Sequence, residues 1–163
     1  MSGLYLEDFE VGDTFETARR TVTEADVVAF AGLSGDYNAL HTDQQFAETT
    51  VHGARIAHGL LVLSITSGLS NQTRMFEGTA IGFVGFQDWN FRAPVYFGDT
   101  VRMRITIESK RRTSKGDRGI VVRRLEVLNQ RDEVVQDGAT LTMVLAREKR
   151  EPDPRPADEG ATR

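Results

Sequence analysis

Hydrophobic residues follow one spacing in the first half of the chain and another in the second. Up to about residue 70 they recur every three or four positions, as on one face of a helix. In segments 101–108 and 139–145 apolar residues instead occupy alternate positions, and 120–128 is a less regular segment of the same kind. Alternation of this type predicts strands with one buried face, as in an antiparallel sheet.

Residues 81–91 form a longer and more irregular apolar segment. Its odd positions hold the large apolar residues Ile81, Phe83, Trp89 and Phe91. Because side chains of a strand point alternately to its two faces, the spacing predicts that these four share one face. The second half of the chain is therefore predicted to be an antiparallel sheet.

The first half predicts two shorter helices. Thr23 can accept a backbone N–H and acidic residues follow it, so it begins a helix that ends within 32–35. Residues 36–41 are then predicted to be a loop. Thr42 or Asp43 begins a short helix that runs to about residue 49.

The segment 59–70 is apolar on most sides, which predicts a buried helix. One buried helix against an antiparallel sheet gives an α+β architecture. The chain has 163 residues, which suits one domain, and we place this domain at 1–147. Segment 148–163 is charged and contains three of the four prolines, so it is predicted to be a disordered tail.

Composition narrows the classes of function. The formal net charge is −4, whereas proteins that bind nucleic acids concentrate positive charge, so no nucleic-acid partner is expected. The chain has no cysteine, which excludes disulfides, thiolate metal sites and a cysteine nucleophile. Its first residues lack the basic and apolar parts of a signal peptide, and no apolar run approaches the ~20 residues of a membrane span. We therefore expect a cytoplasmic protein without a membrane partner.

All three histidines lie within 35–63. Asp36 and His41 are five residues apart, and such a pair could hold a water and move its protons. The same spacing also fits a purely local role, with Asp36 in a turn and His41 packed against its neighbours. Spacing alone leaves both readings open.

The sequence gives less support to a metal site and to a serine hydrolase. A metal site made from His41, His52 and His58 lacks any recognised ligand spacing, so no metal is predicted. Ser64 does not lie in the glycine-flanked elbow of serine hydrolases. His52 is expected to be a solvated loop residue.

A wider motif surrounds the Asp–His pair. The sequence GDYNALHTD at 35–43 is followed by IAHG at 56–59, WNFRAPV at 89–95 and GDTV at 98–101. Together these resemble the MaoC-like hydratase and dehydratase family, the (R)-specific enoyl-CoA hydratases. The likeness covers roughly residues 8–146, and Ala39 stands where the family has proline.

This resemblance implies a hot-dog fold, in which a curved antiparallel sheet wraps a long central helix. It also implies a reaction: Asp36 and His41 activate a water that adds to a trans-2-enoyl-CoA, giving (R)-3-hydroxyacyl-CoA, and the reverse dehydration. The backbone N–H of Gly59, at a helix start, would stabilise the carbonyl oxygen, in keeping with the donors that a helix N-terminus offers. The resemblance assigns supporting roles to Asn38, Ser67 and His58.

The resemblance further implies an acyl-CoA thioester as substrate, no separate cofactor, and a homodimer or higher homo-oligomer. Lys110, Arg111, Arg112 and Lys115 could meet the phosphates of coenzyme A or could simply be solvated. The alternatives are a dehydratase for a branched or carboxylated acyl-CoA or an acyl carrier protein substrate, a hot-dog thioesterase, and a non-catalytic acyl-CoA-binding module. The length of the acyl chain stays open.

Overall fold

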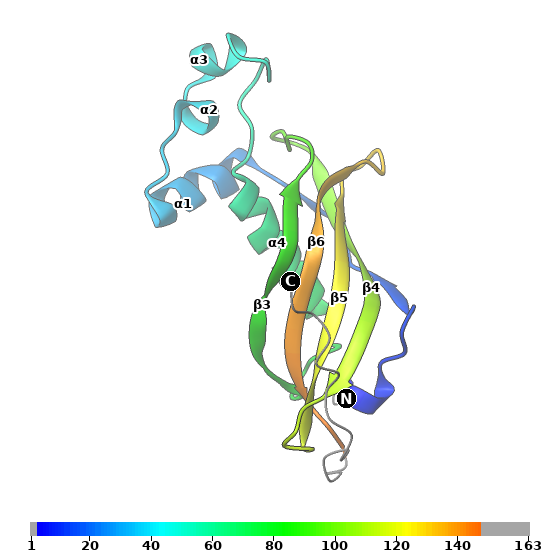
Figure 1. Cartoon of the computed structure of the whole chain (residues 1–163). Helices are drawn as coiled ribbons and strands as arrows, with labels where there is room; N and C mark the ends of the chain where they lie inside the picture. The colour runs from blue at the N-terminus through cyan, green and yellow to red at the C-terminus, as the bar shows by residue number, and fades with distance from the viewer. Residues whose placement is uncertain (1–2, 148–163) are drawn as a thin grey trace, which may run out of the picture.

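A computed structural model describes residues 3–147 and shows a curved antiparallel sheet that wraps one long helix, α4 (Figure 1). Along the sheet the strands are ordered β1-β4-β5-β6-β3, and β2 also pairs with β4. The predicted tail at 148–163 lies outside the described residues. The strands are β1 Thr14–Glu16, β2 Arg20–Thr21, β3 Ala80–Phe91, β4 Thr100–Arg112, β5 Arg118–Leu128 and β6 Val134–Leu145.

The helices other than α4 are short. They are the 3-10 helix η1 Leu6–Asp8, α1 Glu24–Ser34, α2 Ala39–Thr42 and α3 Gln44–Glu48, and α4 itself spans Gly59–Gln72. Helices α1, α2 and α3 gather beyond one end of the sheet, next to the start of α4 (Figure 1). The loops at that end of the strands can therefore meet the first turn of α4.

The core lies between α4 and the concave face of the sheet. Val62, Ile65 and Leu69 of α4 are buried together with residues of the central strands such as Ile105 and Leu125. Burying one such side chain stabilises the fold by about 1.5–3 kcal/mol relative to leaving it exposed. This layout confirms the predicted α+β hot-dog architecture.

Strand β3 departs from the predicted alternation. Its pairing with β6 shifts register at three places, between Ala80 and Gly82, Phe83 and Gly85, and Gln87 and Asn90. Each extra residue at a bulge reverses the faces of the residues that follow. Phe83 and Phe86 therefore share a face, since their partners Thr142 and Thr140 are two residues apart in β6. Phe83 and Phe91 share this face as predicted, since their partners Thr142 and Gln136 are six residues apart in β6. The bulges add Phe86 to the same face and turn Gln87 to the other, which alternation alone did not predict.

The basic cluster of 110–115 lies far from the ends of α2 and α3. Lys110 donates to the backbone oxygen of Glu7, and Arg112 pairs with the Glu7 carboxylate. Both contacts lie beside η1, at the opposite end of the sheet from α2 and α3 (Figure 1). Lys110 and Arg112 therefore pack the N-terminal segment onto β4, and a contact of these two with coenzyme A at the start of α4 is not supported.

Candidate active site

The end of α1 sets the position of Asp36. Thr23 accepts a hydrogen bond from the Asp26 backbone N–H, and the Asp26 carboxylate accepts one from the Thr23 backbone N–H. This reciprocal capping box fixes the start of the helix. Gly35 ends it in the left-handed conformation, with φ of 75°, which favours glycine. The chain turns there, and Asp36 is the first residue after the turn.

Asn38 starts the next helical turn. Its Oδ1 accepts the Leu40 backbone N–H at 3.0 Å, which makes Asn38 the cap of α2. His41 therefore lies on a short helix, and the prediction that 36–41 is a loop was wrong at its last three residues. Ala39 occupies the first helical position, where proline is well tolerated, and the Asn38 cap defines the turn without it.

The His41 ring is oriented by a backbone carbonyl. Its Nδ1 lies 2.8 Å from the oxygen of Ile56, and a carbonyl can only accept, so Nδ1 carries the proton. In the neutral ring Nε2 then keeps a free lone pair. Ile56 itself is bridged to Tyr96, which ties this contact to the segment that follows β3.

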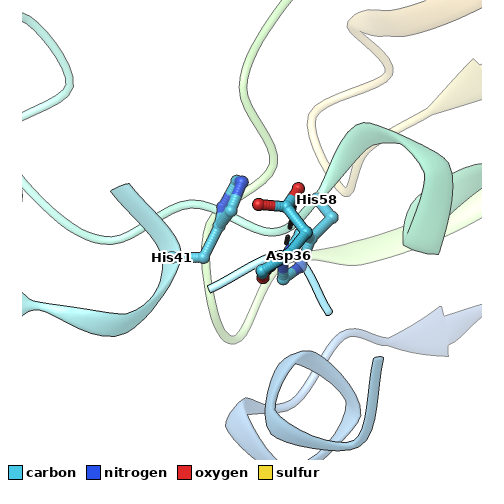
Figure 2. A group of neighbouring side chains, drawn as sticks. All are labelled: Asp36, His41 and His58. Carbon is cyan, nitrogen blue, oxygen red and sulfur yellow. Dashed lines mark hydrogen bonds and ion pairs between the residues drawn. The ribbon is translucent and has the colours of Figure 1, made fainter. Parts of the chain in front are cut away.

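His58 is buried, with 3% of its surface exposed, and it is the N-cap residue of α4. Its Nε2 donates to the backbone oxygen of Asp36 at 2.9 Å and lies 3.9 Å from the Asp36 carboxylate (Figure 2). Its ring stacks on the His41 ring with centroids 3.7 Å apart. His58 thus holds together the segment that carries Asp36 and the ring of His41.

A cavity of about 450 Å³, here called the imidazole pocket, opens beside these residues. His41 and Gly59 both line it, together with Leu60, Phe91 and Gln136. Gly59 is the first residue of α4, and the first N–H groups of a helix have no partner within it and carry partial positive charge. The pocket therefore combines an imidazole lone pair with backbone donors.

Gly59 is held closely on two sides. Its carbonyl oxygen accepts a hydrogen bond from Gln136 Nε2 at 2.9 Å. A Cβ at this position would lie 2.6 Å from Cε1 of Phe91, so the ring occupies the space that any side chain would need. Glycine at the start of α4 permits this close approach.

The remaining predicted site residues divide between two places. Asn38 lies next to the Asp–His pair as the cap of α2, whereas Ser67 lines a second cavity further along α4. His52 was expected to be solvated, but it lines the imidazole pocket and is only partly exposed. Gln136 was not foreseen, and a signal for it would have been a polar residue in the apolar β6 segment.

Asp36, His41 and His58 each have one possible ligand atom within 4.8 Å of the other two. His52, which the sequence argument also weighed as a ligand, is not in this group. The nitrogen of His58 that faces Asp36 donates to a carbonyl, so metal binding there would require breaking that bond. A metal ion there would compete with the contact that holds His58 to the Asp36 backbone.

Comparison with known proteins identifies the family of the chain. Residues 8–128 match the description of the MaoC like domain. A 3-hydroxybutyryl-CoA dehydratase of Methylorubrum extorquens is 36% identical over 152 residues, which cover 91% of this chain and 89% of that protein. An (R)-specific enoyl-CoA hydratase of Rhodospirillum rubrum is 40% identical over 103 residues, 63% of this chain and 69% of that protein.

A solved structure with the same architecture is the MaoC-like dehydratase from Rhodospirillum rubrum. It aligns with a TM-score of 0.79 at 33% identity, over 90% of this chain and 99% of that one. The domain match covers most of the chain, and the dehydratase relative covers nearly all of it. The chain therefore belongs to the MaoC-like domain family.

Proposed function

We propose that this protein hydrates trans-2-enoyl-CoA thioesters to (R)-3-hydroxyacyl-CoA and catalyses the reverse dehydration. At the coarser level the chain is an enzyme of the hydro-lyase class, since relatives that match it over much of its length are named as a dehydratase and a hydratase. One observation supports the proposed substrate and mechanism: His41 and Gly59 line the same pocket, beside Asp36.

The distance between the pair suits one water molecule. Possible ligand atoms of Asp36 and His41 lie within 4.8 Å of each other, and two hydrogen bonds of about 2.8 Å through a single oxygen span such a gap. His41 offers Nε2 as a proton acceptor because Nδ1 already donates to Ile56. The Asp36 carboxylate is the second group that can hold the water.

The proposed reaction adds one water across the carbon–carbon double bond of the enoyl group. The water oxygen bonds to carbon 3 of the enoyl group as the carbon–carbon π bond opens, one water proton passes to the Asp36–His41 pair, and the pair delivers a proton to carbon 2. Negative charge gathers on the thioester oxygen during the addition, and the Gly59 N–H stabilises it. A donor of this kind contributes roughly 10²–10³-fold to the rate, and a positioned acid or base roughly 10²–10⁴-fold.

The decisive experiment follows the loss of crotonyl-CoA absorbance. We expect hydration by the wild-type protein and a loss of about 100-fold or more in Asp36→Asn and His41→Ala. Asp36→Asn is the sharper variant because it keeps the side-chain shape. Wild-type rates in both variants, or an (S)-configured product, would refute the proposal.

Three further assays separate the alternatives. Release of free thiol from acyl-CoA would identify a thioesterase. Calorimetric binding of acyl-CoA without turnover would identify a non-catalytic binding module. Equal turnover of thioesters on acyl carrier protein would widen the substrate class without changing the chemistry.

We also propose that the protein is a homodimer. Strand β3 is an edge of the sheet and exposes the large apolar side chains Ile81, Phe83, Val84 and Phe86. An unpaired, apolar edge strand favours pairing with a second sheet. Gel filtration with mass detection tests this, and a monomer would contradict it.

The helices bear on whether the chain could cross a membrane. None of the helices between residues 3 and 147 has the length and apolar character that a bilayer crossing requires. The cytoplasmic location expected from the sequence stays a prediction.

A further inference from the structure

A second cavity, of about 560 Å³, runs along α4 and is here called the arginine pocket. It shares Leu60 with the imidazole pocket and extends along the helix as far as Ser70. On this side α4 exposes Leu60, Ser64 and Ser67. The arginine pocket therefore begins one residue after Gly59 and continues away from the Asp–His pair.

Arg123 of β5 lines this pocket. It faces α4, because its neighbours at two-residue spacing, Val121 and Leu125, belong to the buried core. Only 7% of its surface is exposed. The cation is thus held inside the fold and within reach of the pocket.

The groups around Arg123 are neutral. Its guanidinium donates to Ser70 Oγ at 3.3 Å and to Thr142 Oγ1 at 3.1 Å, and it lies 4.5 Å from the centre of the Phe76 ring. Within residues 3–147 no carboxylate pairs with it, and its Nε has no hydrogen-bond partner. Thr140, its direct neighbour across the sheet, also lines the pocket, and its hydroxyl is likewise unpartnered in that range.

A buried charge without a counter-charge is costly, so proteins usually pair it. Arg102 of β4 follows the rule: it is buried to a similar degree, and both Glu16 and Asp132 pair with it. Burial lowers the pKa of Arg123 to about 10, and it therefore remains a cation at neutral pH. The proposed hydration reaction makes no use of this charge.

We propose that Arg123 binds a carboxylate at the far end of the acyl chain, so that the preferred substrates are enoyl-CoA thioesters with a terminal carboxyl group. This inference rests on the proposed function. With the thioester at Gly59, the acyl chain would run along the exposed side of α4. Ser70, which contacts Arg123, lies about 16 Å further along the helix at 1.5 Å per residue. The distance between Gly59 and Ser70 requires an acyl chain of medium length.

The test uses matched thioesters that differ only at the end of the chain. Trans-2-enoyl-CoAs of about eight to twelve carbons bracket the roughly 16 Å of helix, each with a terminal carboxylate, methyl ester or methyl group. For the wild-type protein we expect kcat/KM to be at least ~10-fold higher with the carboxylate than with either neutral end, at one or more lengths. The methyl ester controls for size.

Variants assign the preference to Arg123. Arg123→Met should lower the carboxylate-to-methyl ratio of kcat/KM by about 10-fold or more, and Arg123→Lys should retain part of it. Arg124→Met is the matched control, because Arg124 follows Arg123 on the other face of β5 and pairs with Glu108 at the surface. It should leave the ratio unchanged. If Arg123→Met does not fold, the wild-type comparison of carboxylate with methyl ester decides alone.

The outcomes distinguish the two proposals. Hydration of methyl-terminated substrates without a preference for the carboxylate at any length would overturn this inference and leave the proposed function standing. A preference that survives in Arg123→Met would also overturn it, because another group would then bind the carboxylate. If no thioester is turned over, the proposed function falls and this inference falls with it.

Discussion

The imidazole pocket and the arginine pocket lie along the same helix but hold their polar groups in different ways. At the first, backbone carbonyls accept from a ring N–H of His41, which lines the pocket, and of His58, which stacks on His41, so the protonated nitrogen of each ring is defined. In the second, hydroxyls and one aromatic ring surround a full positive charge. The first arrangement orients groups for proton transfer, whereas the second leaves a charge for a ligand to neutralise. One helix thus separates the proposed reaction from the proposed selection of substrate.

The largest effect in this comparison should come from Gly59→Ala. The new methyl group would meet the Phe91 ring, but that ring is about half exposed and can move aside, so we expect the fold to survive. The methyl group would then obstruct the approach of the thioester to the helix start, and kcat/KM should fall by about 10²-fold or more. Crotonyl-CoA hydration measures this.

Gly68→Ala is the matched control, because it lies on α4 and a Cβ there would meet nothing within 4 Å. We expect full activity and a gain of roughly 0.5–1 kcal/mol in the free energy of unfolding. A combined Gly59→Ala and Phe91→Ala protein separates the causes. Restored activity would place the obstruction at the displaced ring and not at the methyl group.

The two buried arginines should differ in stability when each is replaced by methionine. Arg102→Met removes the partner of Glu16 and Asp132, which are themselves well hydrated, so we expect a loss of about 1–2 kcal/mol. Arg123→Met removes an unpaired buried charge and should be neutral or stabilising by up to about 2 kcal/mol. Urea unfolding of both variants measures this. A larger loss for Arg123→Met than for Arg102→Met would show that Arg123 is primarily structural.

The smallest effect concerns α1, which ends just before Asp36, the neighbour of His41. Burial by itself would raise the pKa of Asp26, but hydrogen bonds from Thr23 and the charge of Arg20 bring it below its ordinary value. The ionised carboxylate therefore stabilises the folded state above the unfolded pKa of about 3.9, and this contribution is lost as the pH falls through the folded pKa.

Asp26→Asn should accordingly cost about 0.5–1 kcal/mol at neutral pH. The difference from the wild type should shrink in acid, once the wild-type carboxyl is protonated as well. Urea unfolding at several pH values provides the measurement. A difference that is independent of pH would mean that the charge of Asp26 does not contribute.

Much of the fold could be predicted because it depends on patterns that local sequence carries. A helix that is apolar on most sides must be buried, and alternating strands must present one face to it. The bulges of β3 could not be predicted in this way, since an inserted residue changes the faces without changing composition.

The residues of the two pockets likewise differ in how far the sequence could predict them. Asp36, His41 and Gly59 could be singled out because they form part of a compact motif, and the structure places His41 and Gly59 in one pocket beside Asp36, while their catalytic roles stay predictions. Gln136 and Arg123 come from distant strands, and only the register of the sheet brings them to α4. A lone arginine in a strand reads as solvated until its neighbours across the sheet are known.

The pairing of β3 with β6 has a consequence for the order of folding. Strands β4, β5 and β6 follow one another and pair as a meander, whereas β3 must reach β6 across the whole of β4 and β5. Closing so long a loop is slow compared with forming neighbouring hairpins. Phe91 pairs with Gln136, Gln136 bonds to Gly59, and the Phe91 ring lies over Gly59. The long-range pairing of β3 with β6 and the helix start are thus completed together, so recovery of activity on refolding should report this late step of assembly.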